Sequence, residues 1–203
     1  MRFQLSQFGH CEIEGFPSFV HTKIITDRLL LRPPQGTDFT EWKALRHKNE
    51  EYLKPFDPVW ADDWDTPLSF QKRIQYQRKE WREDRGYFFF IYALDNNKLI
   101  GGININNVVR GAAQFGSLGY WIAEDKQGHG LMSEALDAAI CLCANGLRLA
   151  RINAATLTHN QRSQALLKRF SFERDGLAKA YLNINGTRQD HILYGLNLTK
   201  APE

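Results

Sequence analysis

The sequence predicts a single α/β domain, built on an open mixed sheet of about seven strands with helices on both faces. The order of the segments carries this prediction. Antiparallel hairpins come first, a strand–helix–strand–helix unit follows, and a final hairpin ends the pattern. The 203 residues are enough for one full core, and no linker, repeat or low-complexity segment separates two cores.

The first quarter of the chain contains one clear strand and one clear helix. Residues 1–23 show no regular pattern and are expected to form an N-terminal extension, which leaves residues 24–199 for the domain. The run 28–32 is typical of a strand and is stopped by two prolines. Thr37 is suited to cap a helix that continues to about His47.

A second helix is predicted after a loop at residues 52–65, where prolines and aromatic residues occur without periodicity. Thr66 as the cap and Pro67 in the first turn mark its start, and the pattern continues to about Asp84. The side chains spaced along one side of this helix are Phe70, Ile74, Gln77 and Trp81.

The middle of the chain is rich in strands. Residues 87–94 and 99–109 are predicted strands joined by a polar turn, and a third strand ends at Ala123. A glycine loop follows this strand, and a helix from the loop continues to about Leu147.

The last quarter repeats the change from strand to helix and then ends in a hairpin. Residues 151–157 are a predicted strand, and Asn160 is suited to cap a helix that reaches about Phe170. Two more strands follow, joined at Asn185-Gly186, which is a strong signal for a tight hairpin.

Composition narrows the class of protein. The hydrophobic content of 43% and the charged content of 24% are typical of a soluble globular chain. A net charge of +3 is too small to indicate nucleic-acid binding. The three cysteines lack metal-ligand spacing, so buried free thiols in a reducing cytoplasm are expected, with no metal. We find no signal-peptide core and no apolar run long enough to span a membrane.

The glycine loop Gln127–Met132 lies between a strand and a helix, an arrangement that builds phosphate sites. Glycines let the backbone approach an anion, and the free N–H groups of a helix start point at it. The loop lacks the Gly-Lys-Ser/Thr of a P-loop, and Ser133 replaces the third glycine of a dinucleotide fingerprint. An ordinary turn before a helix is the alternative interpretation of the loop taken alone.

A second polar group of residues opens the next helix. Asn160 and Ser163 are three residues apart, so both can face the same side of the helix start. Simple capping by Asn160 is an equal alternative. The glycine loop and the Asn160–Ser163 pair both follow neighbouring strands. In open sheets, ligands bind outside the carboxyl ends of strands.

Several motifs occur in a fixed order along the chain. They are Leu118-Gly-Tyr-Trp-Ile122, Gln127-Gly-His-Gly-Leu-Met132, Asn160-x-x-Ser163, Phe170-Ser-Phe-Glu173 and Asn185-Gly-x-Arg-x-Asp190. In this order they resemble the GNAT acetyltransferases, and within them the RimJ/RimL ribosomal-protein N-terminal acetyltransferases, RimJ most of all. Two upstream segments, 52–58 and 107–111, are also similar to RimJ. The resemblance covers about residues 24–197 and implies a single-domain GNAT fold.

The resemblance implies that acetyl-CoA is the co-substrate. Gln127, Gly128, His129, Gly130, Leu131 and Met132 would hold its pyrophosphate through backbone N–H groups, with help from the helix dipole. The backbone at Ile122 and Ala123 would pair with the pantetheine arm, and a free strand N–H would polarise the thioester carbonyl. Asn160 would hydrogen-bond the pantetheine.

The resemblance also implies catalytic roles. Ser163 would protonate the departing thiolate. The acidic residue that often serves as base in Rim-type relatives is replaced by Ala180, so Asp57 and Asp190, directly or through water, are the candidate bases, with Glu50 and Glu51 as further possibilities. The lack of an obvious base favours an α-amine acceptor, because its deprotonation near neutral pH costs only roughly 1 kcal/mol, against roughly 4 for lysine.

Three functions remain open at the level of sequence. The first is acetylation of the N-terminal amine of a protein, with a ribosomal protein as the implied partner, by direct attack in a ternary complex. The second is acetylation of a small amine such as a polyamine, amino sugar or antibiotic. The third is a CoA-binding, ribosome-associated protein without turnover. The sequence leaves open whether the protein is a monomer or a homodimer.

Overall fold

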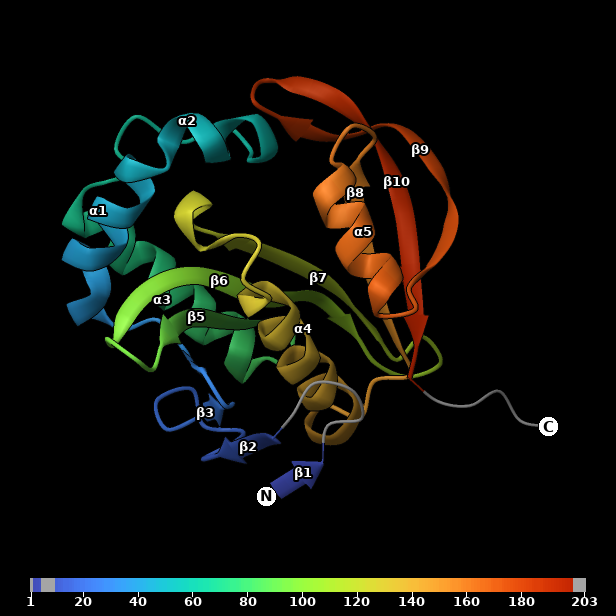
Figure 1. The fold of residues 1–203 in the computed structure, drawn as a ribbon, viewed down its shortest axis with the longest axis horizontal. Coiled ribbons are helices and arrows are strands. Elements are labelled where there is room, and N and C mark those ends of the chain that lie inside the picture. Colours follow the sequence, from blue (N-terminus) through green and yellow to red (C-terminus); the bar gives the residue numbers. More distant parts are fainter. Residues whose placement is uncertain (1, 5–9, 199–203) are drawn as a thin grey trace.

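The computed structural model describes residues 2–4 and 10–198, and within them the fold is a twisted ten-stranded sheet flanked by helices (Figure 1). The sheet order is β1-β2-β3-β4-β5-β6-β7-β8-β10-β9. The strands are β1 (Arg2–Gln4), β2 (His10–Glu14), β3 (Lys23–Ile25), β4 (Leu29–Arg32), β5 (Tyr87–Ala93), β6 (Lys98–Val109), β7 (Phe115–Ile122), β8 (Arg151–Leu157), β9 (Glu173–Ile184) and β10 (Thr187–Asn197). The α-helices are α1 (Phe39–Lys48), α2 (Glu50–Leu53), α3 (Pro67–Arg82), α4 (Leu131–Cys141) and α5 (Gln161–Arg169).

The mixed α/β fold and all seven predicted strands are confirmed as β4 to β10. The sheet is larger than predicted because three short strands, β1 to β3, precede them in the region assigned to an extension or at its boundary. Cys11, Ile13 and Ile24 from β2 and β3 are buried in the main core, so this region is part of the sheet. The proposed domain end at residue 199 lies outside the described residues.

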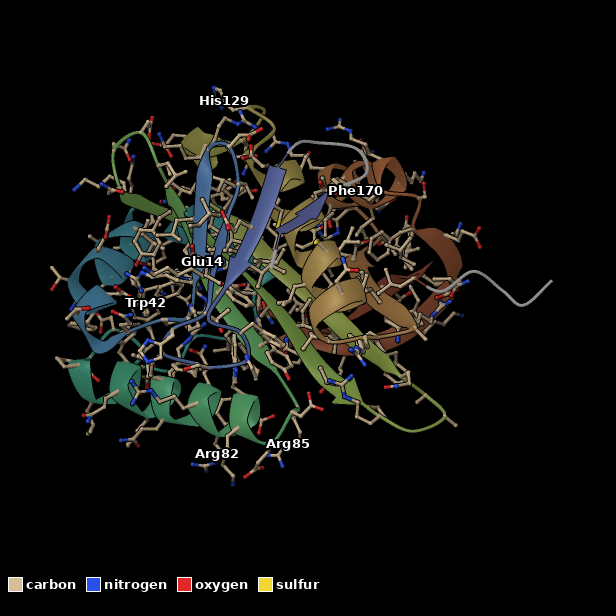
Figure 2. The ribbon with its side chains drawn as sticks, turned by 90° about the horizontal axis from the view of Figure 1, so that it is seen from below. Glu14, Trp42, Arg82, Arg85, His129 and Phe170 are labelled. Atoms are coloured by element: carbon tan, nitrogen blue, oxygen red, sulfur yellow. The ribbon has the colours of Figure 1, made fainter. Side chains whose placement is uncertain are left out.

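Two hydrophobic clusters fill the two faces of the sheet. Alternation along β4 shows this, because Leu29 and Leu31 join the larger cluster, which contains α4, while Leu30 packs against the smaller one. The smaller cluster includes Trp42 of α1, labelled in Figure 2, and Phe70 of α3. The centroids of these two rings lie 4.8 Å apart. The sheet is therefore sandwiched between helices, as the sequence predicted.

Helix starts were predicted well where the capping residue was unambiguous. Thr66 accepts the Ser69 N–H at 3.3 Å with Pro67 in the first turn, and Asn160 accepts the Ser163 N–H at 3.1 Å. Thr37 does not cap its helix. Residues 36–38 form a 3-10 turn before α1, and Asp38 there accepts the Gln35 N–H at 2.7 Å.

Two predicted boundaries shift slightly. The loop predicted at residues 52–65 is partly helical, because α2 and a 3-10 turn, Lys54–Phe56, occupy its start. The helix expected to reach about Leu147 does so as α4 followed by a π-helical segment, Leu142–Gly146. The three cysteines are buried free thiols, as expected. No helix among the described residues is long and apolar enough to cross a membrane.

Strands β7 and β8 are neighbours inside the sheet, form the one parallel pair among the described strands, and are joined over only part of their length. Their pairing runs from Phe115↔Arg151 to Leu118↔Ala154. Beyond Leu118 and Ala154, β7 continues paired to β6 and β8 continues paired to β10. The two strands therefore splay apart, and a gap opens between them within the sheet.

A stability prediction follows from the residue after α5. Ser171 has φ 60°, a left-handed conformation in which a side chain costs roughly 1–2 kcal/mol. Ser171→Gly removes that strain but adds freedom to the unfolded chain, so we expect the free energy of unfolding to rise by about 0.5–1 kcal/mol in urea denaturation. Ser171→Ala keeps the Cβ atom and should bring no gain; equal changes in both variants would contradict the strain.

Candidate active site

The glycine loop forms an open anion cradle at the start of α4. Gly128 and Gly130 both have φ 75°, which allows the sharp reversal from β7 into the helix. Gly130 is the N-cap residue and has no side chain that could occupy the helix start. The N–H groups of the first turn are therefore left for a ligand, and the helix dipole favours an anion there.

An ion pair fixes the loop to a segment that is distant in sequence, just before β4. Glu134, in the first turn of α4, is 7% exposed and accepts Thr26 Oγ1 at 2.6 Å and the backbone N–H of Arg28 at 2.8 Å. The Arg28 side chain donates Nε to the same carboxylate at 2.6 Å and a terminal nitrogen to the His129 carbonyl at 3.0 Å. Arg28, the residue before β4, thus connects this part of the chain to the glycine loop and to α4.

A second bond ties the loop to α5. Gln127 accepts a hydrogen bond from Arg162 at 2.6 Å through its side-chain oxygen. The side-chain amide nitrogen of Gln127 is buried and has no partner among the described residues. The same is true of the hydroxyl of Thr156 on β8. Because buried polar atoms are normally satisfied, these two orphaned groups on the groove wall are suited to a polar ligand.

The splay exposes backbone groups on both sides of the gap. The N–H of Ala123 bonds to the Ile100 carbonyl, so antiparallel alternation directs the backbone groups of Tyr120 and Ile122 away from β6, toward β8. On β8, the backbone N–H of Leu198 bonds to the Ala150 carbonyl. The same alternation therefore directs the backbone groups of Ala155 toward β7. An extended ligand arm can therefore pair with both strands.

Ser163 stands beside this gap and is bonded to a tyrosine. Its hydroxyl lies 2.7 Å from Tyr120 Oη, and its backbone N–H is held by Asn160. Burial raises the pKa of Tyr120 to about 12, so the phenol is protonated at neutral pH. The pair can pass a proton from Tyr120 through Ser163 to an atom in the gap.

The opposite end of the groove is lined by aromatic residues around a partly buried ion pair. Arg46 of α1 contacts the Asp57 carboxylate at 2.5 Å, and Trp60 Nε1 donates to the same carboxylate at 3.0 Å. The guanidinium lies over the rings of Trp60 and Trp121, at 4.1 and 5.1 Å from their centroids. This end combines an apolar surface with a charge that is already neutralised.

The β9–β10 hairpin closes this end of the groove. Asn185 at the hairpin tip donates its backbone N–H to the Asp57 carbonyl at 2.9 Å. Asn185 and Gly186 both have positive φ, 47° and 84°, as a tight hairpin requires. Figure 1 shows the hairpin and α2 meeting above the sheet. The groove has a volume of about 1850 Å³, is open to solvent, and runs through the splay.

The groove brings together most of the residues predicted from the sequence. Those that line it are Asp57, Ile122, Gln127, Gly128, Gly130, Leu131, Met132, Asn160 and Ser163. Three do not. The backbone N–H and carbonyl of Ala123 are used by Ile100 and Lys126. His129 is exposed at the edge of the molecule (Figure 2), and its carbonyl accepts a hydrogen bond from Arg28.

Asp190 is the third residue that stays outside the groove. It is exposed, and its carboxylate accepts the Ala180 N–H at 2.8 Å, which supports a bulge where Ala180 has φ 47°. Glu50 and Glu51 do not line the groove either, and Glu50 is paired with Lys54. Sequence reasoning missed Tyr120 and Arg46. The only signal for Tyr120 was its place in the strand before the glycine loop.

The geometry fits acetyl-CoA as a co-substrate. The cradle at α4 suits its pyrophosphate, the splay suits its pantetheine arm, and the orphaned amide and hydroxyl supply polar partners. Among the described residues there is no cluster of three or more side chains suited to hold a metal ion.

Comparison with known proteins agrees with this assignment. The model of the family described as "Acetyltransferase (GNAT) domain" matches residues 28–173. The ribosomal protein uS5-alanine N-acetyltransferase of Escherichia coli (strain K12) is 36% identical over 174 residues, which is 86% of this chain and 90% of that protein.

Two solved structures share the fold. RimJ of Mycobacterium smegmatis in complex with CoA-disulfide aligns with a TM-score of 0.79 at 29% identity, covering 86% of this chain and 84% of its own. A ribosomal-protein-S5-alanine acetyltransferase from Vibrio fischeri aligns with a TM-score of 0.82 at 25% identity, covering 89% of this chain and 99% of its own.

The Arg28 contacts predict a loss of CoA affinity without a loss of catalytic rate. Arg28→Lys keeps the charge, but one ammonium cannot reach both Glu134 and the His129 carbonyl. One lost hydrogen bond is worth about 1 kcal/mol, so we expect the Kd for CoA in calorimetry to rise about fivefold.

The control for this prediction is Lys48→Met, which removes the exposed Lys48–Asp125 ion pair near the same loop. Exposed pairs contribute little, so this variant should keep the parent affinity within about twofold. Parent-like CoA binding by Arg28→Lys would show that the loop is positioned without it.

Proposed function

The chain belongs to the GNAT acetyltransferase family, and we propose that it transfers the acetyl group of acetyl-CoA to the N-terminal α-amine of a ribosomal protein. The observation that carries the proposal is the groove through the splay, which has a phosphate cradle at one end and an aromatic, charge-compensated chamber at the other. Donor and acceptor can thus be held on opposite sides of one gap. Attack is direct, in a ternary complex.

The charges of the groove support a peptide acceptor over a polyamine. A polyamine site needs an excess of carboxylates, whereas the basic side chains on this groove are at least as numerous as the acidic ones. The basic residues are Arg46, Arg73, Lys126, Arg162 and Arg169, and the acidic ones are Asp57, Asp63, Glu124 and Asp175. The one carboxylate deep in the acceptor end, Asp57, is neutralised by Arg46.

The relatives support the same class of acceptor. The Escherichia coli protein and the Vibrio fischeri structure are both named as alanine N-acetyltransferases of a ribosomal protein. For this chain, a ribosomal-protein acceptor would place the reaction in the cytoplasm. We also propose residues 24–199 as the catalytic unit, with the strands before it as support for α4.

Each part of the site has a task in this reaction. Acetyl-CoA supplies the activated acetyl group when bound. The glycine loop and the start of α4 bind its pyrophosphate, and the open backbone of β7 aligns the thioester and donates an N–H to the carbonyl oxygen. Ser163, bonded to Tyr120, gives a proton to the departing sulfur. The hairpin and Trp60 exclude water from the acceptor end.

Acceptor preference tests the proposal. With acetyl-CoA and a thiol reagent, we expect kcat/KM for a peptide starting with alanine or serine to exceed that for spermidine by about 100-fold, because the chamber lacks the carboxylates that bind a polycation. Preference for spermidine would favour the small-amine function. Absence of turnover with any amine would leave only a CoA-binding protein.

The Tyr120–Ser163 pair predicts a partial loss of rate. A thiol leaving group has a pKa near 8.5, so thiolate departs without full protonation. We therefore expect Ser163→Ala to lower kcat about tenfold while the KM for acetyl-CoA changes less than about twofold.

The pair acts as a unit, which gives the prediction its control. Tyr120→Phe should lose as much rate as Ser163→Ala, and the double variant no more than either alone. Additive losses in the double variant would show that the two hydroxyls act independently.

A further inference from the structure

A histidine on the acceptor side of the groove has no role in the reaction as described so far. His191 of β10 is 3% exposed and lines the groove. In the β8–β10 pairing it lies directly opposite Leu157, the last residue of β8, where the splay is open. Its ring packs edge-on against Tyr181 at 5.8 Å between centroids, which holds its orientation.

The hydrogen bond of His191 determines which ring nitrogen carries the proton. Nδ1 lies 2.9 Å from the backbone carbonyl of Gln189, and a carbonyl only accepts, so Nδ1 must carry the hydrogen in a neutral ring. Nε2 then has a free lone pair. Nε2 makes no hydrogen bond to any residue in 2–4 or 10–198. A buried base is thus available to a ligand in the groove.

The register of β10 places this base opposite the proposed acid. Pairing of β10 with β8 is regular from His191 to Asn197, so His191 and Tyr194 lie on different faces of the sheet. Tyr194 belongs to the core under α4, the face on which α5 carries Ser163. Acid and base therefore reach the gap from opposite sides, as transfer between a sulfur and an amine requires.

The other ionisable groups around this position are already engaged. Asp57 is bonded to Arg46 and Trp60, and Asp190, the next residue on β10, is turned outward to Ala180. Of the groups facing His191, Tyr181 contributes only its ring. Arg188 of the same strand donates to the Tyr181 carbonyl at 3.0 Å.

We propose that His191 is the general base that deprotonates the acceptor amine, directly or through one water. The proposal rests on the proposed function, because it assigns a residue to the α-amine acceptor. It also accounts for catalysis in a chain that has Ala180 where Rim-type relatives often carry an acid.

The proton balance of the step is closed. Nε2 takes one proton from the ammonium, and the nitrogen lone pair then forms the C–N bond while the C–S bond breaks with its electron pair on sulfur. Ser163 gives sulfur a proton and Tyr120 restores Ser163. The second proton leaving the nitrogen restores Tyr120 through solvent. His191 releases its proton to solvent, so one proton is produced per turnover.

The variant that isolates this role is His191→Asn. The asparagine amide can keep the donor to the Gln189 carbonyl, while the lone pair at Nε2 is lost. With a peptide that starts with alanine, we expect kcat to fall about 100-fold, with the KM for acetyl-CoA unchanged within about twofold.

A second acceptor separates a base from a structural residue. In a peptide that starts with aza-alanine, nitrogen replaces Cα, so the terminal amine is nearly isosteric but unprotonated at neutral pH. It needs no base before attack, so we expect His191→Asn to lose less than about fivefold on it. A merely structural defect would slow both acceptors equally, and that result would overturn the proposal.

Two further outcomes decide the remaining cases. A larger loss in Asp190→Asn than in His191→Asn on the alanine peptide would overturn the proposal in favour of the carboxylate. If the parent enzyme instead acetylates spermidine and no peptide, the proposed acceptor fails. The His191→Asn variant measured with spermidine then still tests the identity of the base. An unchanged kcat with spermidine would overturn the assignment of His191.

Discussion

The parting of β7 from β8 is the constraint on which the rest of the site depends. Each strand remains paired on its other side, β7 with β6 and β8 with β10. The sheet therefore stays intact while the space between β7 and β8 opens. Unpaired backbone groups that are buried cost about 1–3 kcal/mol each, so a gap of this kind persists where it remains open to water or ligand. The glycine loop follows β7 after one 3-10 turn, and α5 follows β8. The glycine loop and the Asn160–Ser163 helix start therefore lie at the same opening.

The two ends of the groove differ in electrostatics, and the difference follows from the elements that build them. The α4 end has a helix N-terminus together with Arg162, both of which favour phosphate. At the α1 end the Arg46 guanidinium lies over Trp60 and is bonded to the Asp57 carboxylate, and Arg73 lies over the ring of Trp42. The helix N-terminus thus distinguishes the α4 end as the site for an anion, while the α1 end offers aromatic surface and hydrogen bonds.

The sequence predicted the parts of the fold that local chemistry determines. The caps at Thr66 and Asn160, the turn at Asn185-Gly186 and the glycine loop each depend on residues within a few positions. The strands β1 to β3 were missed because Cys11 and Ile13 give too short an alternation to stand out. The burial of these two residues in the core, beside α4, decides their structure, and sequence pattern does not reveal that.

The residues predicted to bind the donor mostly line the groove, whereas of the candidate bases only Asp57 does, and the reason is the same. The proposed donor site relies largely on backbone groups, whose position glycines in the sequence indicate. The proposed acceptor site relies on side chains whose direction depends on strand register, and neighbours on a strand face opposite ways. Asp190 and His191 illustrate this, since these two consecutive residues are an outward carboxylate and a buried imidazole on the groove.

The bond between Arg28 and Glu134 joins residues 106 positions apart, and Thr26 reaches Glu134 across 108. Contacts of such separation form only after the intervening chain has collapsed, because loop closure must precede them. During synthesis the segment at residues 26–28 leaves the ribosome long before its partner exists. The phosphate cradle is thus among the last parts of the molecule to become rigid, and a chain interrupted before α4 has a partial sheet but no donor site.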